Sequence, residues 1–407
     1  MNVTTPERAA PSHDADASAG TESKSGRAGD PRIEDNSLPR LRGRVGEGAH
    51  VESMGSAGPH PAGDARRPPP QAGEVKQESR DPSRRQGPQQ KRERRDVHGW
   101  VVLDKPVGMT STHAVAVVKR LFNAKRAGHA GTLDPLASGA LPIALGEATK
   151  TVPFVMDGRK RYRFTVRWGE ERDTDDTEGR VTQTSDARPA ADAVRALLPR
   201  FTGVIEQVPP QFSAIKVQGE RAYDLARDGE TVALAPRPVE IHELTLVDQP
   251  DSDHSVLEAE CGKGTYVRAM ARDMGRLLGC YGHICALRRT LCGPFTEEDM
   301  IPLAELEALC DRAASGEGSL ADALLPVETA LDDIPALAVT RADAARLHRG
   351  QAVLLRGRDA PISSGTVYVT VGGRLLALAE LGNGELIPRR VFNLTGLTAS
   401  AGRNQGV

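Results

Sequence analysis

The sequence predicts an α+β protein built around a mixed sheet. Strand and helix patterns follow one another without a regular βαβ repeat and without an internal period. Residues 161–168 give the clearest strand, because aromatic and aliphatic residues alternate there with arginine and threonine. Residues 267–277 predict an amphipathic helix that presents Val267, Met270, Met274 and Leu277 on one face and closes at Gly279.

Five further segments complete the predicted folded part. Residues 110–127 predict a helix that begins near Thr110 and ends before Gly128. The segment HAGTLDPLASGALPIALG (129–146) is expected to be a closely packed loop, because glycine, proline and small residues dominate it. Residues 186–201 are expected to form a helix and residues 257–261 a strand. The run TVYVTV, two glycines and RLLALAEL predict a hairpin inside a small β-rich module at 334–392.

The two ends of the chain have a different composition. Residues 1–96 are rich in Pro, Gly, Ala, Ser and charged residues, so we expect a disordered low-complexity arm, with the folded part beginning near Val97. The basic cluster KRERRDV that ends the arm is typical of a solvated charge run, and contact with phosphates is the alternative. Residues 395–407 are expected to form a flexible tail.

Composition excludes several classes of protein. The 407 residues contain no apolar stretch of about 18 residues, and the N-terminus lacks the pattern of a signal or transit peptide. The five cysteines form no C-x-x-C pair, which argues against a zinc ribbon or a disulfide framework. We therefore expect a cytoplasmic protein. The net charge of −2 provides no broad attraction to nucleic acid, so any RNA contact must be local.

Sequence motifs for metals and nucleotides fail on inspection. The segment DTDDTEG (173–179) resembles a calcium loop, but its glycine is one position late and Thr184 stands where a bidentate Glu belongs. The segment GKGTY (262–266) lacks the order and spacing of a Walker loop. His129 and Asp134 make only a weak metal pair. We expect no metal and no cofactor.

Asp134 is the most informative single residue. It lies in a glycine-rich loop and is followed by Pro135, which biases the aspartate to an extended conformation. A carboxylate placed in this way can attack a sugar-like electrophile. An aspartate before proline can equally be a turn former, and local chemistry leaves both alternatives open.

Several long motifs occur in the order typical of one enzyme family. They are HGWVVLDKPVGMTS (98–111), RAGHAGTLDPLASGALPIALGEATK (126–150), KRYRFTVRWG (160–169), PPQFSAIKVQGERAYDLARDG (209–229), CGKGTYVRAMARDMG (261–275) and ALRRT (286–290). Over residues 97–303 the chain resembles the TruB family of bacterial tRNA pseudouridine-55 synthases. The resemblance implies a mixed-sheet pseudouridine synthase fold with a catalytic domain at 97–325 and a β-rich, PUA-like RNA-binding domain at 330–394. The long arm before Val97 departs from the family pattern.

The resemblance also implies the reaction and its residues. Asp134 matches the family's nucleophile, in an isomerisation that cleaves the glycosidic bond of uridine 55 in the T-arm of tRNA, rotates the uracil and rejoins it through C5. Tyr162 matches a tyrosine that stacks on the uracil and whose hydroxyl is available for the C5 proton. Arg268 matches an arginine that pairs with the nucleophile and keeps it ionised. The resemblance implies three further substrate-binding residues: Tyr266 in the pocket, Leu287 beside the uracil, and His129 on the stem-loop.

Two weaker assignments and two rival functions remain open. Lys105 is as compatible with a structural role as with a functional one, and Lys150 and the arginines around Tyr162 are candidates for phosphate contacts. A glycoside hydrolase would need a second carboxylate about 5 to 10 Å from Asp134, and Glu147 is merely the nearest acid in sequence. A non-catalytic RNA chaperone is the second rival. The expected partner is the tRNA T-arm stem-loop, with no membrane, and the enzyme is expected to be a monomer.

Overall fold

The computed structural model describes residues 93–213, 215–217, 220–221, 233–355 and 364–399. The arm predicted at 1–96 therefore lies, except for its last four residues, outside the described residues. Two of those four contact Asn123: the backbone N–H of Arg95 donates to Asn123 O (2.8 Å), and the Asn123 side chain donates to Glu93 O. The ordered part thus begins before Val97.

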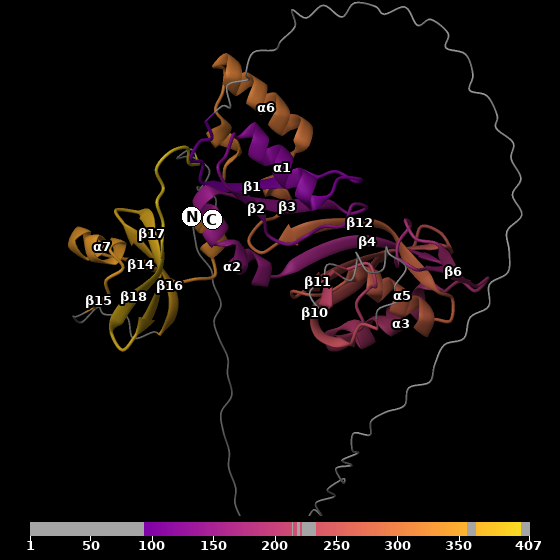
Figure 1. Cartoon of the computed structure of the whole chain (residues 1–407). Coiled ribbons are helices and arrows are strands. Elements are labelled where there is room, and N and C mark those ends of the chain that lie inside the picture. The colour runs from indigo at the N-terminus through magenta and orange to yellow at the C-terminus, as the bar shows by residue number, and fades with distance from the viewer. Residues whose placement is uncertain (1–92, 214, 218–219, 222–232, 356–363, 400–407) are drawn as a thin grey trace, which may run out of the picture. The chain divides into compact units, whose positions relative to one another are not determined.

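A nine-stranded mixed sheet forms the larger body, which confirms the predicted fold class (Figure 1). Its strand order is β13-β1-β3-β12-β4-β11-β10-β7, with β2 on β3. The strands are β1 (Gly99–Lys105), β2 (Ala127–His129), β3 (Ser138–Leu145), β4 (Lys160–Trp168), β7 (Gly203–Gln207), β10 (Arg237–Asp248), β11 (His254–Cys261), β12 (Gly282–Cys292) and β13 (Met300–Pro302). Two small hairpins pair β5 (Glu170–Arg172) with β6 (Val181–Thr184), and β8 (Lys216–Val217) with β9 (Glu220–Arg221).

Helices cover this sheet, and α1 lies beside β1 and β3 (Figure 1). The α-helices are α1 (Ser111–Leu121), α2 (Val152–Asp157), α3 (Ala191–Leu197), α5 (Val267–Leu277) and α6 (Leu303–Ser315). The 3₁₀ helices are η1 (Gly146–Lys150), η2 (Leu198–Phe201), η3 (Glu297–Asp299), η4 (Leu320–Ala323) and η5 (Val327–Leu331). The predicted cap of α1 is confirmed, since Thr110 Oγ1 accepts from the His113 N–H. The predicted helix at 267–277 is confirmed as α5.

Strand β1 shows how the core is divided by the sheet. Val101 and Leu103 pack into a cluster on one face, whereas Trp100 and Val102 pack into a cluster on the other. Successive side chains of a strand point to opposite faces, so β1 is buried on both sides. The centre of the sheet is therefore rigid, and it supports the side chains at the ends of its strands.

Two sequence predictions are wrong in detail. The segment 129–146 is not a loop throughout, because Ser138–Leu145 forms the buried strand β3 between β1 and β12. Pro142 and Gly139 concealed it, since both residues are normally evidence against a central strand. The helix expected at 186–201 is limited to Ala191–Leu197, followed by a 3₁₀ turn. Pro189 restricts the residue before it and delays the start of the helix.

The β-rich module at the C-terminus is a five-stranded sheet with one helix. It contains β14 (Ala336–Ala338), α7 (Arg341–His348), β15 (Val353–Leu354), β16 (Gly365–Val371), β17 (Arg374–Gly382) and β18 (Glu385–Val391). The predicted hairpin is confirmed as β16 and β17. Gly372 and Gly373 have φ angles of 56° and 75°, the combination that a two-residue hairpin turn with two positive φ values requires.

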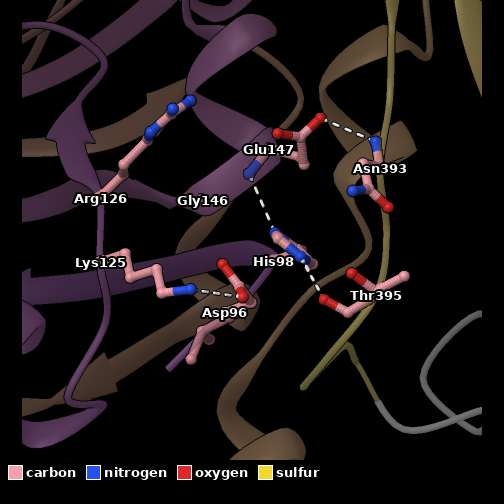
Figure 2. Close-up of a pocket in the computed structure, with 9 residues that line it drawn as sticks. Asp96, His98, Lys125, Arg126, Gly146, Glu147, Asn393 and Thr395 are labelled. Carbon is pink, nitrogen blue, oxygen red and sulfur yellow. Dashed lines mark hydrogen bonds and ion pairs between the residues drawn. The ribbon is translucent and has the colours of Figure 1, made fainter. Parts of the chain in front are cut away.

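The segment after β18 returns to the first strand instead of beginning a tail. The Leu397 N–H donates to Asp96 O, and the His98 N–H donates to Leu397 O. The His98 ring accepts from the Glu147 N–H at Nδ1 (3.1 Å) and donates from Nε2 to Thr395 O (2.7 Å), beside a cavity of about 310 Å³ (Figure 2). The expectation of a flexible tail from residue 395 is therefore wrong for 395–399. The prediction for 400–407 lies outside the described residues.

Candidate active site

A cavity of about 300 Å³ opens at the ends of β4 and β12, beside the start of α5. Five of the six residues predicted for the site line it: Asp134, Tyr162, Tyr266, Arg268 and Leu287. They come from four separate stretches of the chain. The fold therefore brings together in space residues that the sequence had linked only through separate motifs.

The loop that carries Asp134 is held by side chains from the neighbouring segments. Ser111 Oγ donates to Leu133 O and accepts from the Leu133 N–H, both at 2.9 Å. The Gly108 N–H and Lys105 Nζ donate to Pro135 O at 2.7 and 3.3 Å. The Asp134 carbonyl accepts from the Ala137 N–H, so the residue is also a turn former. These bonds fix the loop on both sides of the aspartate, whose side chain stays 35% exposed.

Lys105 supports the loop from within the core. Its side chain is fully buried, and Nζ also donates to the carbonyls of Pro106 and Met109 at 2.9 and 2.8 Å. Burial lowers the pKa of Lys105 to about 8, and the charge of Asp134 opposes this shift. Lys105 thus stabilises the turn that presents Asp134.

Arg268 pairs with Asp134, as the sequence motifs implied. Arg268 lies in the first turn of α5 with only 5% of its side chain exposed, and its Nε is 2.8 Å from Asp134 Oδ2. The N–H of Nε is poorly aligned for a hydrogen bond, so the contact is an ion pair. Nη1 and Nη2 donate to the carbonyls of Thr174 and Phe212, both at 2.9 Å. Backbone groups therefore orient the guanidinium independently of Asp134.

Two buried carboxylates behind Arg268 were missed by the sequence analysis. Asp176 Oδ2 lies 3.4 Å from Arg268 Nη1, and Asp175 Oδ2 lies 2.9 Å from Arg272 Nη1. Both aspartates belong to the segment 173–179 that was rejected as a calcium loop. Burial raises the pKa of Asp175 to about 7, against the opposing effect of Arg272. The segment's two adjacent acids and the R-x-x-x-R spacing of Arg268 and Arg272 on one helix face are the signals that could have predicted these pairs.

Tyr162 enters the cavity from β4 and lies opposite Arg289 of β12 in the antiparallel register. Burial raises the pKa of its phenol to about 12, and the positive charge of Arg289 opposes the rise. The other inward side chains of β4, Phe164, Val166 and Trp168, are buried. The alternating pattern of the sequence is therefore correct for the strand, and Tyr162 is its one aromatic residue at the cavity.

Comparison with known proteins assigns this arrangement to a family. A model of the TruB family pseudouridylate synthase N-terminal domain matches residues 119–267, and a model of the tRNA pseudouridylate synthase B C-terminal domain matches residues 268–332. The chain is 83% identical over 334 residues to tRNA pseudouridine synthase B of Bradyrhizobium diazoefficiens, covering 82% of this chain and 97% of that protein. The chain belongs to the TruB family.

Further matches extend this result. The protein of the same name from Agrobacterium fabrum is 59% identical over 301 residues, covering 73% of this chain and 95% of that protein. Among solved structures, the fold is similar to a chain of an H/ACA RNP bound to a substrate RNA containing 2'-deoxyuridine. That likeness has a TM-score of 0.58 at 24% identity and covers 73% of this chain and 85% of that chain. It supports the fold alone.

Tyr266 and Leu287 complete the wall of the cavity in this TruB-family chain. Tyr266 precedes α5, and Gln207 holds its backbone through two hydrogen bonds, from the Tyr266 N–H (2.8 Å) and to its carbonyl (3.1 Å). The Arg237 guanidinium lies 5.4 Å from the centre of the Tyr266 ring. Leu287 is a buried residue of β12. The cavity thus has apolar surface on both sides of the Asp134 and Arg268 pair.

Two predicted residues have other surroundings than expected. His129, at the end of β2, does not line the cavity, and its buried Nδ1 has no hydrogen-bond partner among the described residues. Burial lowers the pKa of His129, helped by the charge of Arg289, so the ring is neutral at neutral pH. Lys150 is not a free cation, because Nζ pairs with Glu147 and donates to Val391 O at 2.7 Å. It ties η1 to the C-terminal module.

No helix in the described part of the chain is both long and apolar enough to cross a membrane.

Proposed function

We propose that this chain converts uridine 55 in the T-arm of tRNA to pseudouridine, with Asp134 as the nucleophile. Membership of the TruB family makes it a tRNA pseudouridine synthase, an isomerase. The observation that supports Asp134 in particular is its position: among the described residues that line the cavity it is the sole carboxylate, and Arg268 lies 2.8 Å from it. A carboxylate that is partly open to the cavity and held beside a fixed cation is placed to act as a nucleophile.

The reaction conserves the atoms of the substrate. The N1–C1' bond breaks, the uracil rotates, and a bond forms between C5 and C1'. The C5 proton leaves and N1 gains a proton, so the product is an isomer. A carboxylate next to the ribose stabilises the positive charge that develops as the base departs, or attacks the sugar directly. Tyr162, with its ring beside the uracil and its hydroxyl in the cavity, is the group that receives the C5 proton.

RNA binding requires the uridine to leave its stack, because the glycosidic carbon is inaccessible in folded RNA. We assign Tyr266 and Leu287 to the walls that hold the extruded uracil, and His129 to the stem-loop. Residues 97–325 would form the catalytic domain and residues 330–394 a PUA-like RNA-binding domain. The two bodies share one hydrophobic cluster, in which Leu375 and Phe392 pack with Trp100. We place the enzyme in the cytoplasm as a monomer that needs neither metal nor cofactor.

A glycoside hydrolase is less well supported by the geometry. Glu147 is paired with Lys150 and accepts a hydrogen bond from the Asn393 N–H. It lines the cavity beside His98 rather than the cavity of Asp134 (Figure 2). A retaining or inverting hydrolase needs a second carboxylate across the sugar. The described residues that line the Asp134 cavity contain none.

The test is the Asp134→Asn variant, because it removes the charge and almost no volume. We expect tRNA binding to be retained and pseudouridine at position 55 to be lost, as mapped in tRNA after incubation with purified protein. Asp192→Asn is the matched control, since Asp192 is exposed and pairs with Arg195 on α3, and neither residue lines this cavity. Retained turnover in Asp134→Asn would refute the assignment. Release of free uracil by the wild-type enzyme would indicate a hydrolase instead.

A further inference from the structure

Arg289 is a buried cation that the mechanism above does not use. Only 1% of this β12 residue is exposed, and none of the described residues forms an ion pair with it. Its Nε donates to Ala140 O at 2.7 Å and its Nη2 donates to Gly131 O at 3.1 Å. Neutral carbonyls compensate a buried charge less well than a carboxylate does, so the fold bears a desolvation cost at this position.

The partners of Arg289 belong to the reacting part of the molecule. Gly131 begins the GTLD segment that ends with Asp134, and Ala140 lies in β3 just beyond it. On its other side Arg289 is the direct cross-strand neighbour of Tyr162, and both side chains line the cavity of Asp134. Arg289 therefore connects the loop of the nucleophile to the phenol that faces the same cavity.

The electrostatic effect of this placement falls on Tyr162. A phenol in a buried site resists loss of its proton, because the phenolate is poorly solvated there. A fixed positive charge on the directly paired residue favours the phenolate, and it does so most strongly where water is excluded. Arg289 is fixed by two backbone carbonyls, so it offers this charge without having to reorganise.

We propose that Arg289 is a positioning residue that holds the Tyr162 hydroxyl and stabilises its phenolate while Tyr162 removes the proton from C5 of the uracil. The phenolate takes the proton, the C5–H electron pair re-forms the ring double bond, and N1 gains a proton from solvent. The phenol then returns its own proton to solvent, so no further reactant is needed. This inference rests on the proposed function, specifically on Tyr162 as the acceptor of the C5 proton.

The experiment compares Arg289→Gln, which removes the charge, with Arg289→Lys, which keeps it. The matched control is Arg288→Gln, because Arg288 is the adjacent residue of β12 but pairs with Asp104 and Glu297 outside this cavity. Single-turnover rates are measured from pH 6 to pH 9 on full-length protein, with tRNA that carries either hydrogen or deuterium at C5 of uridine 55. Thermal unfolding and tRNA binding are measured for every variant.

For Arg289→Gln we expect a rate at least about tenfold below wild type near neutral pH. The rate of the variant should then rise by about tenfold for each unit of increasing pH, as the phenolate becomes accessible. The C5 deuterium isotope effect should rise above the wild-type value, because proton removal becomes rate-limiting. tRNA affinity should not change, and Arg288→Gln should behave as wild type. A merely structural role would move neither the isotope effect nor the shape of the pH profile.

A rate that falls by the same factor at every pH, with an unchanged isotope effect, would overturn the proposal. If Arg289→Gln does not fold, Arg289→Lys provides the test, since its shorter side chain keeps a positive charge but places it farther from Tyr162. A lowered rate with a raised isotope effect then supports the proposal, and a lowered rate with a wild-type isotope effect contradicts it. Failure of the proposed function looks different: the wild-type enzyme would form no pseudouridine, or Asp134→Asn would remain active.

Discussion

Removing the Arg268 side chain should destabilise the protein mainly through Asp176, a carboxylate that does not line the cavity of Asp134. Arg268→Met leaves Asp134 without its cation, but Asp134 is 35% exposed and water can solvate it. Asp176 is different, since only 4% of its side chain is exposed and its Oδ2 lies 3.4 Å from Arg268 Nη1. Arg268→Met therefore leaves a buried, uncompensated negative charge.

The size of the effect follows from the distance. Two unit charges 3.4 Å apart attract by about 5 kcal/mol at an effective dielectric constant of about 20. Breaking a buried pair by removing one partner typically costs about 3 to 5 kcal/mol. Adding Asp176→Asn removes the charge yet leaves an oxygen that can accept from Thr174 Oγ1 and the Glu178 N–H, as Oδ1 does now. The double variant should regain about 2 to 3 kcal/mol of the stability lost in Arg268→Met.

The assay is a double-mutant cycle of urea unfolding on wild type, the two single variants and the double variant. Lys125 and Asp96 provide the matched control, because their contact of 2.7 Å is shorter but their side chains are 52% and 49% exposed. Their coupling should be about 1 kcal/mol or less. Additive free energies for Arg268→Met and Asp176→Asn would refute the argument. All variants without Arg268 should lose turnover, whatever their stability.

Three further outcomes can be measured with simple variants. Burial lowers the folded-state pKa of Lys105 to about 8, whereas the ordinary pKa is 10.5. Between these two pH values the unfolded chain binds more protons than the folded chain, so stability is lost as pH falls through 8. Wild type should therefore gain about 2 kcal/mol relative to Lys105→Met between pH 7.5 and 9.5 in urea unfolding; a constant difference would contradict this. In Gly139→Ala the new Cβ would lie 2.2 Å from Arg289 O at a φ of +96°, so thermal unfolding should show a loss of more than about 2 kcal/mol. Gly203→Ala, with a similar φ but open space around it, should lose only about 1 kcal/mol, and equal losses would exclude the clash. Deletion of residues 1–92 should leave turnover on free tRNA unchanged, and a large drop would give the arm a substrate role.

The sequence predicted those elements whose pattern repeats locally. The alternation at Tyr162 to Trp168 and the apolar face of α5 follow from the geometry of single elements, and both are confirmed. Strand β3 was missed because it is buried on both faces, which removes the alternation, and because Gly139 and Pro142 are poor strand residues. Its pairing with β1 and β12 supplies the stabilisation that its own sequence lacks.

Long-range charge pairing was out of reach of the sequence for a related reason. Nothing near Asp176 in the sequence indicates that its counter-charge is Arg268. Arg268 lies in α5, and β7, β10 and β11 come between the two residues along the chain. The same acids looked like an imperfect calcium loop because metal ligands and ion-pair partners have the same chemistry. Asp134 and Arg268 were paired only through their motifs, and the 2.8 Å contact is the observation that local chemistry could not provide.

The arrangement explains how one exposed carboxylate can act without a second carboxylate beside it. Asp176 and the backbone carbonyls of Thr174 and Phe212 fix Arg268, so the cation that faces Asp134 is already oriented before RNA binds. In the proposed covalent route Asp134 loses its charge, and because Asp176 compensates Arg268 from behind, Arg268 can remain buried at that step. In this proposal the buried ion pair stabilises the intermediate as well as the resting enzyme, and the two aspartates have separate roles at one guanidinium.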